Sequence, residues 1–155
     1  MPKESAGLLL YRLRNHALEC LLVHPGGPFW KNKHAGAWTI PKGEIRSGED
    51  PLAAAQREFA EELGFTPTNH FLPLTPVKQK AGKIIRAWAV EGDCDPNAFK
   101  SNTFELEWPP RSGHRQEFPE VDQAAFFGLA EAKQKINPAQ VPFLDELAQI
   151  VAAGG

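Results

Sequence analysis

The sequence predicts a single α/β domain in which helices pack against a mixed β-sheet. Its 155 residues, 42% of them hydrophobic, suit one compact domain with a real core. Short apolar segments with strand character are interspersed with two segments of helical spacing. Regular βαβ units are too few for a doubly wound parallel sheet, so we expect an α/β sandwich with a mixed sheet. The sequence shows no internal repeat and no second domain, and residues 1–155 are expected to form one domain.

The first strands are predicted near the N-terminus. Ser5–Tyr11 and Leu18–His24 are apolar and rich in leucine, and the polar segment 12–17 separates them. This pattern predicts two adjacent strands joined by a turn. Pro-Gly-Gly-Pro at 25–28 then begins a loop, and Ala37–Ile40 forms a brief extended piece that Pro41 ends.

The clearest helix is predicted at Glu49–Leu63. Asp50 is suited to cap the N-terminus of this helix, and Pro51 is favourable in its first turn. Gly64 follows the last turn, where a left-handed C-terminal cap is expected.

The second half of the chain contains three further predicted strands and a final helix. Lys83–Glu91 and Val121–Phe127 have strand character, and Thr103–Trp108 alternates strictly between apolar and acidic residues. Pro138 opens the C-terminal helix, whose apolar residues follow helical spacing and should pack on the sheet. These residues are Phe143, Leu144, Leu147, Ile150 and Val151.

Charge and composition exclude several classes of function. The formal net charge is −2, with acids and bases interleaved, so no general attraction for nucleic acid or an anionic membrane is expected. No stable nucleic-acid partner is therefore predicted, and a phosphorylated substrate would have to be attracted locally. The sequence shows neither a signal-like N-terminus nor an apolar run of about 18 residues. Cys20 and Cys94 are expected to be reduced thiols of a cytoplasmic protein.

Three carboxylates share one face of the predicted helix. Glu58, Glu61 and Glu62 are spaced i, i+3, i+4, which places them side by side. A solvated acidic helix face would have the same spacing, but clustered oxygen ligands also suit a hard divalent cation such as Mg²⁺. The segment before the helix favours a metal site. Lys42 can meet a phosphate, and Gly43 permits an unusual backbone turn beside a cation.

The segment from Gly43 to Phe65, GEIRSGEDPLAAAQREFAEELGF, resembles the Nudix box. Its fixed positions are all met, by Gly43, Glu49, Arg57, Glu58, Glu61, Glu62 and Gly64. Phe59 and Phe65 occupy two positions where aliphatic residues are commoner, which is a mild departure. The resemblance implies an αβα sandwich and a hydrolase that cuts a diphosphate linkage. Activity is expected with Mg²⁺, and with Mn²⁺ as a substitute.

The same resemblance assigns expected roles to residues of the box. Glu58 and Glu62 should be the main metal ligands, and Gly43 should offer its backbone carbonyl. Glu61 should be a further ligand or the base that deprotonates water. Glu49 and Arg57 should form an ion pair that braces the loop against the helix.

Several Nudix relatives take one more glutamate from a loop beyond the box. Glu117 and Glu120 are the two alternatives here, and an ordinary loop carboxylate would look the same. Glu120 is favoured because it lies six residues before Phe126, where relatives tend to have a strand aromatic. The base therefore remains open between Glu61, Glu117 and Glu120.

Substrate-binding residues are expected outside the acidic helix. The stretch AWTIPKG at 37–43 is similar to Nudix enzymes acting on diadenosine polyphosphates or diphosphoinositol polyphosphates, and Lys42 is the expected phosphate contact. Two basic loops could hold distal phosphates, although solvated loops would have the same composition. The first has Trp30, Lys31, Lys33 and His34, and the second has Arg111, His114 and Arg115. Trp30 is the better candidate for stacking on a base, whereas Trp38 and Trp88 are expected in the core.

The expected function is hydrolysis of a nucleoside diphosphate linked to another group, with a dinucleoside polyphosphate as the first choice. Alternatives in the same class are oxidised nucleoside triphosphates, ADP-ribose and diphosphoinositols. A non-catalytic nucleotide sensor and an isomerase on the same fold are alternatives in other classes. The intact set of three glutamates argues against the sensor. Oligomeric state does not follow from the sequence.

Overall fold

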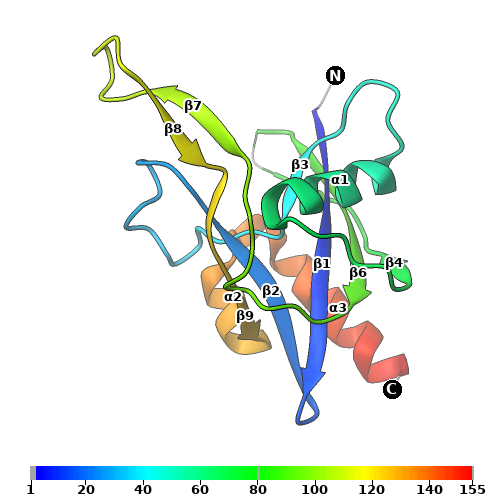
Figure 1. Cartoon of the computed structure of the whole chain (residues 1–155). Coiled ribbons are helices and arrows are strands. Elements are labelled where there is room, and N and C mark those ends of the chain that lie inside the picture. The colour runs from blue at the N-terminus through cyan, green and yellow to red at the C-terminus, as the bar shows by residue number, and fades with distance from the viewer. Residues whose placement is uncertain (1–2, 80, 155) are drawn as a thin grey trace.

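The computed structural model describes residues 3–79 and 81–154, and within them a mixed seven-stranded sheet lies between two helical layers (Figure 1). Helix α1 covers one face of the sheet, while α2 and α3 cover the other. The predicted α/β sandwich with a mixed sheet is thereby confirmed. The strands of this sheet are β1 (Glu4–Arg14), β2 (Ala17–Pro25), β3 (Lys42–Glu44), β4 (Phe71–Pro73), β5 (Val77–Lys78), β6 (Ile84–Glu91) and β9 (Val121–Gly128). The helices are α1 (Pro51–Leu63), α2 (Leu129–Lys135) and α3 (Val141–Gly154), with a 3₁₀ turn η1 (Pro138–Gln140) before α3.

Strand β1 is the centre of the sheet. It runs parallel to β6 and antiparallel to β2 and β3, in the order β4-β6-β1-β2-β9 with β3 beside β1 and β5 beside β6. Alternate residues of a strand face opposite sides, and β1 divides the core accordingly. Leu8 and Leu10 face α1, whereas Leu9 and Tyr11 belong to the cluster packed against α2 and α3.

Helix α1 has the capping residues that the sequence predicts. The Asp50 carboxylate accepts a hydrogen bond from the Ala53 N–H at 3.1 Å, and Gly64 ends the helix with φ of 84°. Phe59 and Leu63 are buried against the sheet. The helix begins at Pro51, so the predicted start at Glu49 is two residues early. Glu49 lies in the preceding loop because Asp50, as N-cap, has extended backbone angles.

Strands β7 (Thr103–Glu107) and β8 (Arg115–Pro119) form a separate two-stranded hairpin that projects from the body (Figure 1). Only its first strand was expected, and the prediction that Arg115 lies in a loop is wrong. The positive φ angles of Arg111 and Gly113 reverse the chain tightly, so Arg115 pairs with Glu107 at the start of β8. Helix α2 is a further element that sequence patterning missed.

Two smaller expectations concern thiols and membranes. Cys20 is buried, Cys94 is partly buried, and both are free thiols. In the described part of the chain, every helix is too short or too polar to cross a bilayer.

Candidate active site

The backbone of Gly43 lies directly against the side chain of Glu58. β3 is fixed beside β1 through the pairing of Gly43 with Ala6, and α1 packs over the same strands. A Cβ atom at Gly43 would overlap the Glu58 carboxylate. Glycine is therefore required here for close approach, and the contact joins the first residue of the predicted box to its helix.

Glu62 is the most buried carboxylate of the helix. It is 8% exposed, and its Oε2 has no hydrogen-bond partner within the described residues. Burial and the nearby charge of Glu58 raise its pKa well above the usual range. An unpartnered buried carboxylate oxygen is costly, and a cation would compensate it. With Glu58 partly buried alongside, the oxygen donors of this corner fit a hard divalent ion.

Arg57 is hydrogen-bonded to two carboxylates of the helix, those of Glu58 and Glu61. Its Nη1 donates to Glu58 Oε1 at 2.7 Å and to Glu61 Oε2 at 3.1 Å. Among residues 3–79 and 81–154, His, Cys, Asp and Glu side chains form no ready-made set of three metal ligands. The carboxylates that could complete such a set are thus turned toward the guanidinium.

Arg57 also ties the helix to the loop before it. Its Nε and Nη2 form a two-pronged ion pair with Glu49, at 2.8 and 2.9 Å, and Nη2 donates to the Glu44 carbonyl. The hydrogen bonds from Arg57 lower the pKa of Glu49 to about 2. The guanidinium therefore bridges β3, the loop and α1, which holds Gly43 against the helix.

The two candidate glutamates beyond the box, Glu117 and Glu120, lie in different surroundings. Burial, followed by the charges of Glu58 and Glu61, raises the pKa of Glu120. The Glu120 N–H donates to Asn102, whose N–H in turn donates to the Glu61 carbonyl. Glu117 instead lies exposed on β8 and accepts a hydrogen bond from Thr103 Oγ1 at 2.9 Å.

Lys42 lies on the opposite side of β3 from the Gly43–Glu58 contact. It pairs with Gly7, and a Cβ at Gly7 would meet the Cβ of Lys42, so Lys42 faces the side that α3 covers. Burial, and then the charge of Lys83, lowers the pKa of Lys42. The sequence did not single out Lys83 as a neighbour of Lys42, because the two residues are far apart in the chain.

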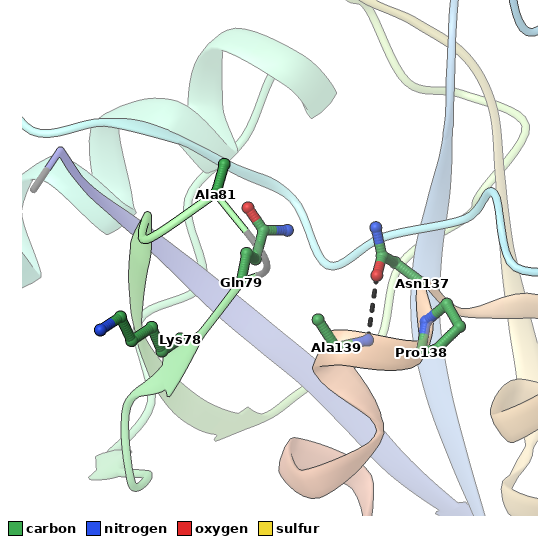
Figure 2. Close-up of a pocket in the computed structure, with 6 residues that line it drawn as sticks. All are labelled: Lys78, Gln79, Ala81, Asn137, Pro138 and Ala139. Atoms are coloured by element: carbon green, nitrogen blue, oxygen red, sulfur yellow. Dashed lines mark hydrogen bonds between the residues drawn. The ribbon is translucent and has the colours of Figure 1, made fainter.

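A cavity of about 950 Å³ opens between the turn before β6 and the 3₁₀ turn that precedes α3 (Figure 2). Its lining residues are Lys78, Gln79, Ala81, Asn137, Pro138 and Ala139. The Gln79 N–H donates to the Lys83 carbonyl, so Lys83 borders the cavity wall.

The loop 25–36 and the β7–β8 hairpin, predicted as two separate basic regions, are in contact. The Phe29 and Trp108 rings meet edge to face with centroids 5.4 Å apart. Trp30 is 42% exposed, and Lys33 Nζ lies 5.6 Å from its ring centre. The remaining predicted cations of these regions, Lys31, Arg111, His114 and Arg115, are exposed. Arg115 forms an ion pair with Glu105 at 3.4 Å, while Trp38 is buried as expected.

Comparison with known proteins gives a consistent result. A sequence model of the NUDIX domain matches residues 1–147. Bis(5′-nucleosyl)-tetraphosphatase [asymmetrical] of Caenorhabditis elegans is 38% identical over 66 residues, which cover 43% of this chain and 44% of that protein. RNA pyrophosphohydrolase of Roseobacter denitrificans is 46% identical over 37 residues, 24% of this chain and 23% of that protein. The matches thus span less than half of these curated relatives.

Solved structures share the fold over nearly the whole chain. The binary complex of C. elegans Ap4A hydrolase has a TM-score of 0.67 at 23% identity, covering 97% of this chain and 99% of that one. The NUDIX domain of Shewanella oneidensis NrtR, complexed with ADP ribose, has a TM-score of 0.62 at 17% identity, covering 96% and 87%.

Proposed function

The chain belongs to the NUDIX family, and from that premise we propose that it is a pyrophosphohydrolase that cuts a phosphoric anhydride in a dinucleoside polyphosphate with the help of Mg²⁺. The observation that carries the proposal is the corner where the backbone of Gly43 meets Glu58, beside the buried and unpartnered oxygen of Glu62. Substrate choice would depend on the basic residues outside this corner and on the cavity before α3.

Glu58, Glu62 and the Gly43 carbonyl would hold the divalent cation, with Glu61 as a further ligand once Arg57 releases it. A bound cation neutralises phosphate charge and makes water more acidic. Mn²⁺ has the same preference for oxygen ligands and should substitute. Arg57 and Glu49 contact neither water nor substrate in this scheme, and they position the helix against β3.

Glu120 is the proposed general base. Its carboxylate lies near the helix cluster, and its raised pKa makes it a better proton acceptor near neutral pH than an ordinary glutamate. Glu120 takes a proton from the attacking water as the water oxygen bonds to phosphorus. The bridging P–O bond breaks, and the leaving phosphate departs with its electron pair.

The two flanking regions would hold the two ends of a long substrate. On one side, Lys42 and Lys83 would contact phosphates, and the adjoining cavity has room for a nucleoside. On the other side, Trp30 offers an exposed ring for stacking on a base. Lys31, Lys33, Arg111 and Arg115 supply positive charge there. A mononucleotide would engage only one of these regions.

Relatives support the substrate proposal and suggest one alternative substrate. The C. elegans tetraphosphatase is named for a dinucleoside polyphosphate, and its match covers 43% of this chain. RNA pyrophosphohydrolase relatives are 43–46% identical over shorter segments. A 5′-triphosphorylated oligonucleotide is therefore the second candidate substrate.

The test is a substrate panel with Mg²⁺ in excess and products separated by chromatography. The panel contains diadenosine tetraphosphate, ATP, ADP-ribose and a short 5′-triphosphorylated RNA. We expect the highest kcat/KM on diadenosine tetraphosphate, loss of turnover with chelator, and recovery with Mg²⁺ or Mn²⁺. Full turnover in excess chelator would refute the metal-dependent mechanism, and a preference for ATP or RNA would refute only the substrate.

A further inference from the structure

The ring of His24 is fully buried at the end of β2, and both of its nitrogens are engaged. Nδ1 lies 2.7 Å from Asp122 Oδ1, and Nε2 lies 2.6 Å from the Lys33 carbonyl oxygen. The His34 ring stacks on His24 with centroids 4.8 Å apart, and Trp38 packs at its edge. Among the described residues, the ring is thus bonded to the Asp122 carboxylate and to the backbone of Lys33, and it is stacked on the titratable ring of His34.

These partners determine which protons the ring must bear. A backbone carbonyl only accepts hydrogen bonds, so Nε2 carries a hydrogen. An ionised carboxylate also only accepts, so Nδ1 carries a second hydrogen. The Asp122 side chain is one-third exposed and can remain hydrated. Beside an ionised Asp122, these two contacts call for a hydrogen on each ring nitrogen.

A β-bulge directs Asp122 to this ring. His24 pairs with Gln123 and Pro25 pairs with Val121, which leaves Asp122 as the extra residue of β9. A bulge redirects a side chain and bends its strand. Immediately before the bulge, the Gly26 N–H donates to the Glu120 carbonyl. The bulge at Asp122 thus lies where the loop 25–36 is hydrogen-bonded to Glu120, the proposed general base.

We propose that His24 is an imidazolium paired with Asp122, and that this buried pair is a positioning device that fixes the loop 25–36 to the end of β2. His24 itself touches neither substrate nor metal. It acts through the Lys33 carbonyl, and so it places Trp30, Lys31 and Lys33. The role of this loop in substrate binding rests on the proposed function, whereas the charge state of His24 and the anchoring of the loop do not.

The first experiment measures the charge state directly. Two-bond ¹H–¹⁵N correlation spectra of the ¹⁵N-histidine-labelled protein at pH 7 identify which ring nitrogens are protonated, and His24→Gln assigns the signals. We expect both nitrogens of His24 to be protonated in the wild type and one to lose its proton in Asp122→Asn. A wild-type His24 with one bare nitrogen overturns the proposal.

The second experiment measures loop anchoring and substrate binding. In Asp122→Asn, amide hydrogen exchange across residues 26–36 should be at least about tenfold faster, because a neutral pair holds the Lys33 carbonyl less firmly. KM for diadenosine tetraphosphate should rise about fivefold to tenfold, with kcat within about threefold of wild type. Asp145→Asn is the matched control. It removes one exposed aspartate of α3 that pairs with Lys133 and has no bond to His24 or Lys33, and should change neither quantity.

The two readouts separate the possible failures. Unchanged exchange in both Asp122→Asn and His24→Gln overturns the positioning role, even if activity falls. Faster exchange with an unchanged KM overturns the link between this loop and substrate. If the wild type hydrolyses none of the panel, the proposed function fails, while the spectra and the exchange rates still decide the charge and the anchoring.

Discussion

Replacing Gly43 with alanine tests the geometry of the active-site corner with the smallest possible change. The added methyl would overlap the Glu58 carboxylate. Because ordinary carbon contacts lie at about 3.5–4.0 Å, the carboxylate must withdraw by at least about 1 Å. Glu58 meets this methyl with the flexible end of its side chain, so the fold should survive and the change should fall on the position of one proposed metal ligand.

A misplacement of about 1 Å in a catalytic constellation costs on the order of a hundredfold in rate. We therefore expect kcat of Gly43→Ala to fall by about two orders of magnitude, equivalent to roughly 2.7 kcal/mol in the barrier. The Mg²⁺ concentration that gives half-maximal rate should rise as well. The melting temperature in the absence of metal should change by only a few degrees, because no core side chain is lost.

The assay is steady-state hydrolysis of diadenosine tetraphosphate across a Mg²⁺ titration, with circular dichroism to follow unfolding. Gly128→Ala is the matched control, since the added methyl there meets open space at the start of α2. If Gly43→Ala retains a rate within about threefold of wild type at every Mg²⁺ concentration, the contact between Gly43 and Glu58 has no part in catalysis.

Four further predictions concern single side chains. Glu62→Gln should lose at least about a hundredfold in kcat yet unfold at a higher temperature in chelator, because a buried charge is removed. The pKa of Lys42 is lowered, so this lysine should lose its positive charge at a lower pH than an ordinary lysine does. KM should therefore rise as the pH is increased toward the usual pKa of lysine, and Lys42→Arg should abolish this rise. The stability from the Glu49–Arg57 pair should be present above about pH 4.5 and lost toward about pH 2, as measured by denaturant unfolding of wild type against Glu49→Gln. Trp30→Ala should narrow the kcat/KM preference for diadenosine tetraphosphate over ATP, since one stacked base is worth about 1–3 kcal/mol; an unchanged ratio would contradict the stacking role.

Local rules predict the helix and its caps. The caps of α1 and the side-by-side carboxylates follow from spacing along one helix, which the sequence displays directly. The Glu49–Arg57 ion pair, implied by the resemblance, is present in the structure. These features involve residues close in sequence, so they depend little on how distant parts of the chain pack.

Features that depend on distant pairing could not be predicted. Lys83 reaches Lys42 only because β6 lies parallel to β1, and His24 meets Asp122 across 98 residues. Strand β8 escaped detection because Arg115–Pro119 contains one large apolar residue, Phe118, and therefore lacks clear alternation. In the hairpin, only β7 shows the alternation of apolar and acidic residues that predicts a strand.

The hairpin formed by β7 and β8 has a consequence for altering specificity. Asn102 and Glu120 fix its base beside the acidic corner, while its turn at 109–113 lies at the far end of a ladder separate from the main sheet. The turn adds no strand to the main sheet, so we expect the body to fold when residues 109–113 are lengthened, given other charges or replaced. Selection for new substrates can begin at residues 109–113 while the metal corner and the core keep their sequence.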